Sequence, residues 1–358
     1  MAKLSESPLL KWYAEYRRDL PWRKTNIPYE IWISEMMLQQ TRVDTVIPYY
    51  LRWMENYPDI KILASAHRDD VLKTWEGLGY YRRAHAIHET AAIILLKYGG
   101  KFPSQVSELR QLPGIGPYTA SAIAAFAFGQ DILAIDGNVR RVLSRWIDLE
   151  FDPRTRDGES RLRDWATLTM PSGMAAEYNQ AVMDLGALLC TAKNPSCNTC
   201  PLALTCLAHQ RGTQSSRPVR SPRKKSPSHT AAAAVLLQGE RVLIGRRPEG
   251  KLLGGLWEFP GGKQEDGESI EACLRREIKE ELDVVIKVGA SLGSFKNTYT
   301  HFKITVYAFF AEITVGEPMP LDHTSLAWVH PAELDGYPMG KIDRAIANEL
   351  RLQVEMNG

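Results

Sequence analysis

Four of the five cysteines in this 358-residue chain follow one another closely, as Cys190, Cys197, Cys200 and Cys206, in the spacing C-x6-C-x2-C-x5-C. The N-terminal residues lack the apolar core and cleavage site of a signal peptide, so we expect thiols rather than disulfides, and these thiols predict a metal site. Structural zinc usually takes two CxxC pairs, and only one pair is present here. Uneven spacing on a compact loop favours an iron–sulfur cluster, with zinc as the alternative.

A second set of candidate metal ligands lies in "SIEACLRREIKEEL", where Glu277, Glu280 and Glu281 occur at positions i, i+3 and i+4. On a helix this spacing places three carboxylates on one face, where they could gather Mg²⁺ for pyrophosphate chemistry. A solvated acidic helix face produces the same pattern, so both interpretations stay open.

Glu35 is a carboxyl-bearing residue within an apolar segment, "EIWISEMMLQQTRVDTVIPYY". The apolar spacing predicts one amphipathic helix that continues from Ile33 to Glu55. A solvated helix face would explain an isolated glutamate. An apolar pocket beside Trp32 and Met36 would instead raise the pKa of the carboxyl and let it hold a proton near neutral pH.

The segment "LRQLPGIGPYTASAIAAFAFG" has the pattern of two helices joined by a glycine turn at Gly114 and Gly116, with Pro117 in the first turn of the second helix. Such a turn lets the backbone approach a phosphate closely, and the following helix N-terminus offers free N–H groups. A plain helix–helix turn is the alternative. Further on, Asp136 is placed to cap the helix that starts near Gly137.

These residues require a multidomain chain. Helical patterns dominate residues 1–208, a basic Ser- and Pro-rich linker without acidic residues covers 209–229, and strand patterns with one helix fill 230–358. The first two strands are predicted to form a hairpin that turns at Gly239. We therefore expect an all-α domain, a basic linker and an α+β domain.

Charge and hydropathy indicate whether the chain is suited to bind a polyanion or to cross a membrane. The net charge is +2, but residues 229–358 contain 14 basic and 19 acidic side chains, which leaves +7 on the preceding residues. The basic helical part is therefore the candidate for binding a polyanion. No apolar run approaches ~20 residues, so we expect no membrane span, a cytoplasmic location and, without a legible apolar patch, a monomer.

The motifs together resemble one family. The cysteine spacing is similar to the 4Fe–4S loop of the endonuclease III superfamily of helix–hairpin–helix DNA glycosylases, in which the cluster is structural. "LPWRK", "SEMMLQQTRVDTVIPYY", "WEGLGYYRRAHAIH", the glycine turn and "IDGNV" add a close resemblance to the MutY-type, adenine-specific mismatch glycosylases over residues 8–206. This resemblance implies base excision repair of adenine mispaired with 8-oxoguanine or guanine in duplex DNA.

The resemblance also implies catalytic roles. Glu35 matches the family's general acid, which protonates the departing adenine, and Asp136 matches the carboxylate that stabilises the resulting sugar cation, electrostatically or covalently. Members that also cut the backbone have a lysine where this chain has Tyr118, so we expect a monofunctional hydrolytic glycosylase. A related glycosylase or lyase for oxidised pyrimidines, and a non-catalytic lesion sensor, are the competing interpretations.

Further residues match positions that contact the flipped adenine or the opposite base. By the resemblance, Gln40 and Tyr80 wedge near the oxidised guanine, with Thr41 and Leu78 beside them. Trp22, Arg23 and Gln180 line the adenine pocket. Core packing of the aromatic pair Tyr80–Tyr81 is the alternative for those residues.

Residues 262–284 match the Nudix box almost completely, with Asp283 where a glycine is usual, a mild departure because Asp tolerates the left-handed conformation. MutY-type enzymes carry a Nudix-like domain that recognises 8-oxoguanine. We therefore expect recognition, with Thr300 and His301 on the contacting loop. Because the acidic cluster is retained, Mg²⁺-dependent hydrolysis of oxidised nucleoside triphosphates is the alternative.

Overall fold

The computed structural model describes residues 7–220, 227–299 and 301–357, and the chain packs as two units. The helical unit comprises residues 1–64 and 89–223, and the sheet unit comprises residues 65–88 and 224–358. The predicted linker begins inside a short helix and ends inside the first strand, and residues 221–226 of it lie outside the described residues. Residues 65–88 thus pack with the strands although the sequence places them among helices.

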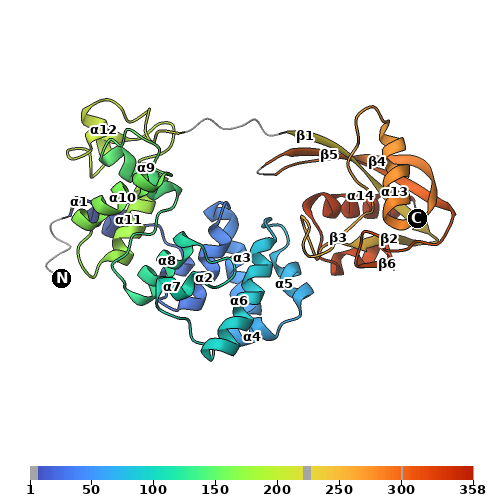
Figure 1. The fold of residues 1–358 in the computed structure, drawn as a ribbon, viewed down its shortest axis with the longest axis horizontal. Coiled ribbons are helices and arrows are strands. Elements are labelled where there is room, and N and C mark those ends of the chain that lie inside the picture. The colour runs from blue at the N-terminus through green and yellow to red at the C-terminus, as the bar shows by residue number, and fades with distance from the viewer. Residues whose placement is uncertain (1–6, 221–226, 300, 358) are drawn as a thin grey trace. The chain divides into compact units, whose positions relative to one another are not determined.

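The helical unit is built from short helices (Figure 1). They pack around a core of aliphatic and aromatic side chains. Its elements are α1 (Pro8–Tyr16), η2 (Pro21–Arg23), α2 (Pro28–Leu38), α3 (Val43–Asn56), α4 (Ile60–Ser65), α7 (Val106–Leu109), α8 (Pro117–Phe128), α9 (Gly137–Trp146), α10 (Arg156–Thr169), α11 (Ala175–Leu188), η3 (Cys197–Thr199) and α12 (Leu207–Gln210). Helix α11 contacts α1, α8 and α9, so it lies at the centre of this core.

The single helix predicted from Ile33 to Glu55 is wrong, because the chain forms two helices, α2 and α3, with a turn at residues 39–42. Gln40 adopts a left-handed backbone conformation (φ 58°), which an α-helix cannot contain. Helix α2 is also buried on nearly every side rather than amphipathic, since eight of its eleven residues are buried. Gln39 and Gln40 therefore lie in the turn after α2 and not within a helix.

In the sheet unit, a six-stranded sheet lies between two helices (Figure 1). Its elements are α5 (Arg68–Trp75), α6 (Arg82–Tyr98, which continues into the helical unit), β1 (Ser228–Gln238), β2 (Arg241–Arg246), β3 (Trp257–Glu258), α13 (Ile270–Leu282), β4 (Val285–Thr298), β5 (Lys303–Val315), β6 (Ser325–Val329), η4 (Pro331–Gly336) and α14 (Lys341–Asn357). The strand order is β3-β2-β1-β5-β4, and β6 pairs with β2.

Strand alternation explains the two cores of this sheet. Ala231, Ala233 and Val235 of β1 pack toward α14, whereas Ala232 and Ala234 pack toward α13. The predicted hairpin is confirmed, because Leu237 pairs with Val242 around a turn in which Gly239 has a positive φ. Asp283 ends α13 in the left-handed conformation (φ 57°), as the sequence predicts. Within the described residues, every helix is too short or too polar to cross a bilayer.

Candidate active site

A cavity with a volume of about 670 Å³ belongs to the helical unit. It is lined by residues of the stretch 18–43, which includes η2 and α2, and by α8, α9 and α11, so segments distant in sequence converge on it. Eight residues predicted from the sequence to act in catalysis, to line the adenine pocket or to lie near the opposite base are on its wall: Trp22, Arg23, Glu35, Gln40, Thr41, Tyr118, Asp136 and Gln180. The predictions made for these separate motifs therefore meet in one place.

Glu35 is buried in the wall of this cavity, with 4 % of its surface exposed, which excludes a solvated helix face. Helix α2 presents it between the buried Ser34 and Met36, and its one described hydrogen-bond donor is the Tyr118 hydroxyl, at 2.6 Å. Burial raises the pKa of Glu35 to about 7, the nearby Asp136 carboxylate adds to the rise, and the Tyr118 hydrogen bond and Arg23 oppose it. The carboxyl can therefore hold a proton at neutral pH.

Asp136 is the second carboxyl of the cavity, and its surroundings differ from those of Glu35. It caps α9 as predicted, accepting hydrogen bonds from the Val139 amide at 2.6 Å and from the Asn138 side chain at 3.1 Å. Burial raises the pKa of Asp136, and these hydrogen bonds offset only part of the rise, although a helix N-terminus favours negative charge. Because Asp136 accepts hydrogen bonds from several donors and Glu35 from one, Asp136 is the better suited of the two to carry the negative charge while Glu35 donates a proton.

A buried carboxylate that the sequence did not reveal, Asp184, pairs with two arginines of the cavity wall, Arg18 and Arg23. Asp184 of α11 is fully buried. It accepts hydrogen bonds from both Nη atoms of Arg23, at 2.6 and 2.8 Å, and from Nε of Arg18, at 2.7 Å. The two guanidinium groups lower the pKa of Asp184, although its burial works in the opposite direction. Because the negative charge of Asp184 offsets the positive charge of Arg23, the Arg23 guanidinium lowers the pKa of Glu35 less than an unpaired cation at the same place would.

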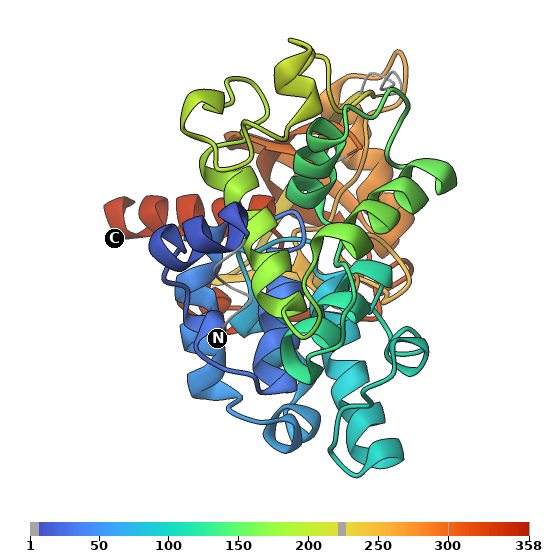
Figure 2. The same ribbon diagram turned by 90° about the vertical axis from the view of Figure 1, so that its left-hand side faces the viewer.

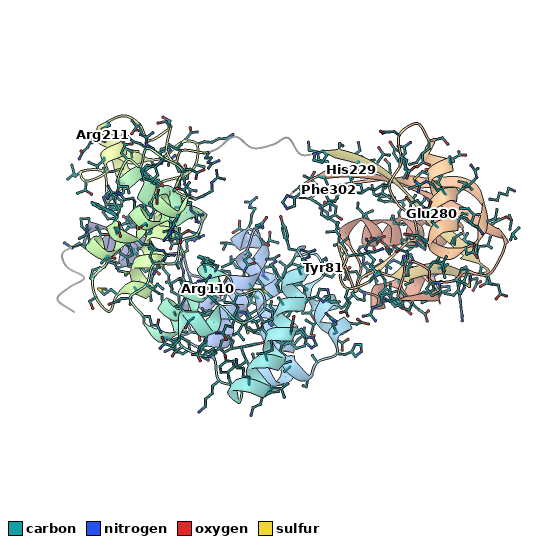
Figure 3. The ribbon with its side chains drawn as sticks, in the orientation of Figure 1. Tyr81, Arg110, Arg211, His229, Glu280 and Phe302 are labelled. Carbon is teal, nitrogen blue, oxygen red and sulfur yellow. The ribbon has the colours of Figure 1, made fainter. Side chains whose placement is uncertain are left out.

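The glycine turn forms the predicted helix–hairpin–helix between α7 and α8. Gly114 has a φ of +74°, which favours glycine, and Gly116 is the residue that precedes the first turn of α8. The hydroxyl of Thr90 fixes the turn by donating to the Pro113 carbonyl at 2.9 Å. Arg110, just before the turn, is exposed (Figure 3). The turn therefore presents backbone N–H groups next to a positive charge, which suits a phosphate.

The four clustered cysteines line one small cavity beside α9, on the yellow-green loop of Figures 1 and 2. Arg145 of α9 donates to Sγ of Cys190 at 3.3 Å, and Sγ of Cys206 approaches the Arg145 carbonyl at 3.4 Å. The buried Oε1 of Gln214, on the same wall, has no hydrogen-bond partner among the described residues. All four thiols are free, so the loop offers a four-sulfur donor set next to a fixed cation.

Leu78 and Tyr80 lie in the sheet unit, on the loop between α5 and α6. Leu78 is buried, whereas Tyr80 is 44 % exposed and has a left-handed backbone (φ 52°). Tyr81 is buried within this unit, so core packing is the correct interpretation for Tyr81 but not for Tyr80.

The acidic residues of the Nudix box separate in the structure. Glu277 and Glu280 pair with Arg276, at 2.9 and 3.3 Å, and Glu280 projects from α13 into solvent (Figure 3). Glu281 is buried instead, and its ligand atoms lie within 4.8 Å of those of Glu258 and His323. In the described part of the chain no such group includes Glu277 or Glu280. Glu281 therefore has different partners from Glu277 and Glu280 in the structure.

Buried charge sets the pKa values around Glu281. Burial raises the pKa of Glu281 to about 7, with a further rise from Glu258, and His323 opposes the shift. The pKa of His323 is raised by Glu258 and Glu281, although burial works against it. Of the predicted contact loop, His301 is exposed, and Thr300 lies outside the described residues.

Comparison with known proteins accounts for both units. Residues 33–167 match the HhH-GPD superfamily of base excision DNA repair proteins, and residues 231–349 match the Nudix domain. The adenine DNA glycosylase of Rattus norvegicus is 36 % identical over 84 % of this chain and 69 % of its own length. That of Buchnera aphidicola from Schizaphis graminum is 33 % identical over 86 % of this chain and 87 % of its own length.

Solved structures agree with the helical unit. A thermostable thymine-DNA glycosylase superposes with a TM-score of 0.54 at 28 % identity, over 58 % of this chain and 96 % of its own. A covalent DNA intermediate of endonuclease III superposes with a TM-score of 0.50 at 22 % identity, over 59 % of this chain and 97 % of its own, a likeness of fold alone. The solved structures thus agree in fold, and the relatives show that the chain belongs to the adenine DNA glycosylase family.

Proposed function

We propose that this adenine DNA glycosylase hydrolyses the N-glycosidic bond of adenine opposite 8-oxoguanine or guanine in duplex DNA and does not cut the backbone. The observation that carries the proposal is the buried Glu35 carboxyl, with a pKa raised to about 7, on the wall of a 670 Å³ cavity that also holds Asp136. A base flipped out of the duplex needs a pocket of this kind, and adenine leaves readily only after a ring nitrogen is protonated.

The two carboxyls divide the reaction. Protonated Glu35 gives its proton to a ring nitrogen of adenine as the bond to C1′ breaks, and the bonding electrons leave with the base. The ionised Asp136, held by its two hydrogen-bond donors, stabilises the cationic sugar. Water then adds its hydroxyl to C1′ and returns a proton to the Glu35 carboxylate, so the enzyme is regenerated.

The absence of an amine nucleophile supports hydrolysis without strand cleavage. A lyase needs an amine that forms a Schiff base with the opened sugar, and a phenol such as Tyr118 cannot do so. No lysine is found among the described residues that line the cavity. Borohydride treatment of the enzyme with its DNA should therefore trap no covalent adduct, and a high yield of adduct would refute this part of the proposal.

Substrate choice is tested with duplexes that differ at one base pair. We expect adenine release, revealed as strand cleavage after alkali, when adenine lies opposite 8-oxoguanine or guanine. A duplex with an oxidised pyrimidine should remain intact. Cleavage of that duplex, or intact adenine opposite 8-oxoguanine, would contradict the proposal.

For the cysteine loop, we propose a structural 4Fe–4S cluster held by Cys190, Cys197, Cys200 and Cys206. The four thiols converge on one cavity, and Arg145 offers a hydrogen bond to sulfur and a positive charge near the anionic cluster. When bound, the cluster would tie the loop to α9 and shape a surface for DNA. Iron and sulfide analysis of the purified protein should give four of each per chain, and zinc in their place would refute the assignment.

For the sheet unit, we propose recognition of the oxidised base, supported by aromatic side chains at the ends of β1, β4 and β5. Phe302 contacts His229 at 5.4 Å (Figure 3) and Tyr299 at 4.8 Å between ring centroids, and Lys263 lies over its ring. Rings of this kind can stack on a base. Hydrolysis of 8-oxo-dGTP by the whole chain with Mg²⁺, measured as pyrophosphate release, tests the alternative, and we expect none.

A further inference from the structure

The loop that carries Tyr80 is held in an unusual conformation. Gly77, Gly79 and Tyr80 all have positive φ angles, of 99°, 73° and 52°. A bulky residue such as tyrosine rarely adopts this conformation unless its surroundings impose it. The conformation of the loop therefore depends on contacts made by its flanks.

One set of these contacts comes from within the loop's own helices. The indole N–H of Trp75 donates to the Gly79 carbonyl at 3.0 Å. The buried Arg83 donates to the carbonyls of Leu78 and Gly79, at 3.3 and 3.0 Å, and its guanidinium lies over the rings of Trp75 and Tyr80. These contacts close the loop but do not attach it to the sheet.

The residues on either side of the loop make that attachment. The Tyr81 hydroxyl donates to the Met339 carbonyl at 2.9 Å in a buried hydrogen bond. Glu76 forms a bidentate pair with Arg344 of α14, at 2.5 and 3.2 Å, and also accepts from the Met339 amide at 3.4 Å. Glu76 and Arg344 are 14 % and 16 % exposed, so water screens this pair weakly.

The anchor point is itself part of the sheet. Met339 bridges to Trp257 of β3, and the Trp257 amide donates to the Pro338 carbonyl at 2.9 Å. Arg344 is fixed at the same place because it also donates to the carbonyls of Leu334 and Tyr337, at 2.9 and 2.5 Å. Both ends of the Tyr80 loop therefore join one rigid corner between β3 and α14.

From this geometry we propose that Glu76 and Tyr81 are positioning residues through which the Nudix sheet sets the conformation of Tyr80. The inference rests on the proposed function, in which Tyr80 contacts the base opposite adenine. The sheet that inspects the oxidised base and the loop that carries the tyrosine then form one packed body, so discrimination between 8-oxoguanine and guanine requires their attachment.

The first test is physical and independent of activity. Glu76→Gln and Tyr81→Phe in the full chain should each speed amide hydrogen exchange at residues 77–81. Lys279→Gln is the control, because Lys279 lies on α13 of the same unit and pairs with Asp283 at the end of that helix instead of with the loop or Arg344. Unchanged exchange in both loop variants would overturn the proposal.

The second test measures single-turnover adenine excision opposite 8-oxoguanine and opposite guanine. Glu76→Gln and Tyr81→Phe should each lower the ratio of the two rates by between about twofold and thirtyfold. Wild-type enzyme that leaves adenine opposite 8-oxoguanine in place would instead refute the proposed function, and the exchange result would still decide whether the loop is held this way.

A double variant separates positioning from general damage to the fold. In a Tyr80→Ala background, Glu76→Gln should change the ratio by less than about twofold, since the ring that it positions is gone. If Glu76→Gln keeps its full effect without Tyr80, or if Lys279→Gln reproduces that effect, the positioning role is wrong.

Discussion

Each unit of this enzyme buries one glutamate whose pKa is raised to about 7, Glu35 in the helical unit and Glu281 in the sheet unit. Burial is the main cause in both cases. Their neighbours differ: Glu35 accepts one hydrogen bond, from the neutral Tyr118 hydroxyl, and faces a 670 Å³ cavity. Glu281 accepts the Gly261 amide at 2.9 Å, and its ligand atoms lie within 4.8 Å of those of Glu258 and His323.

The difference shows that a raised pKa indicates that a carboxyl is buried but does not indicate whether it acts in catalysis. Glu35 adjoins space for a substrate and a second carboxyl that can stay ionised, so its proton can be used. Glu281 lies beside Glu258 and His323, and His323 can supply the compensating charge. The stability of the fold should therefore depend on the protonation of this group. Substitution of Glu35 should therefore lower the excision rate, whereas substitution of Glu281 should change the stability of the fold.

The largest expected effect is that of Glu35→Gln. The amide cannot give up a proton, so single-turnover adenine excision should fall by about 10²- to 10⁴-fold while duplex binding is retained. Glu281→Gln is the matched control in the other unit, and it should leave the rate within about twofold of wild type. Excision at the wild-type rate by Glu35→Gln would end the assignment of the general acid.

Asp136→Asn should have the next largest effect, a loss of about 10²- to 10³-fold in excision rate, because the charge that stabilises the sugar cation is removed. Asparagine caps helices about as well as aspartate, so α9 should persist. Circular dichroism and thermal melting check this point. A variant that keeps its fold and excises within tenfold of wild type would show that the anion is dispensable.

Tyr118→Phe should shift the pH profile rather than abolish the reaction. The excision rate of wild type should fall as pH rises through about 7, because Glu35 must be protonated to act. The Tyr118 hydrogen bond lowers the pKa of Glu35, so its removal raises that pKa and moves the fall to higher pH, by less than about one unit. Rate measurements from pH 5 to 9 test this, and a shift to lower pH would contradict the proposed role of the hydroxyl.

The same two regions show what the sequence could predict. Glu35, Asp136 and the four cysteines lie in short motifs whose spacing is local, and the structure brings each group onto one cavity. The ion pairs that hold these sites in place join distant segments: Arg23 with Asp184, and Glu76 with Arg344. Their sequence separations are 161 and 268 residues, so no local pattern reveals them.

Helical spacing also left partners unpredicted. Glu277, Glu280 and Glu281 share the spacing of one helix face, but Arg276 pairs with the first two, and Glu281 lies beside Glu258 and His323. In the same way, the apolar pattern from Ile33 to Glu55 continued through residues 39–42, where the chain turns. Helical periodicity indicates which side chains can share a face, and tertiary partners decide which of them do.

The smallest expected effect concerns stability in the sheet unit. The folded-state pKa of Glu281, about 7, exceeds the value near 4.5 of an exposed glutamate, so the folded state binds the proton more tightly. The free energy of unfolding should therefore decrease as pH rises from about 4.5 to 7, and His323, whose pKa is also raised, loses its stabilising charge as pH rises further.

The glutamine of Glu281→Gln cannot ionise, so this substitution should raise the free energy of unfolding at pH 8 by about 1–3 kcal/mol. Hydrogen exchange of α13 at pH 5 and pH 8, corrected for intrinsic rates, measures this difference. Slower exchange in the variant at pH 8 but not at pH 5 is the expected result, and equal exchange at both would show that Glu281 is already neutralised by its neighbours.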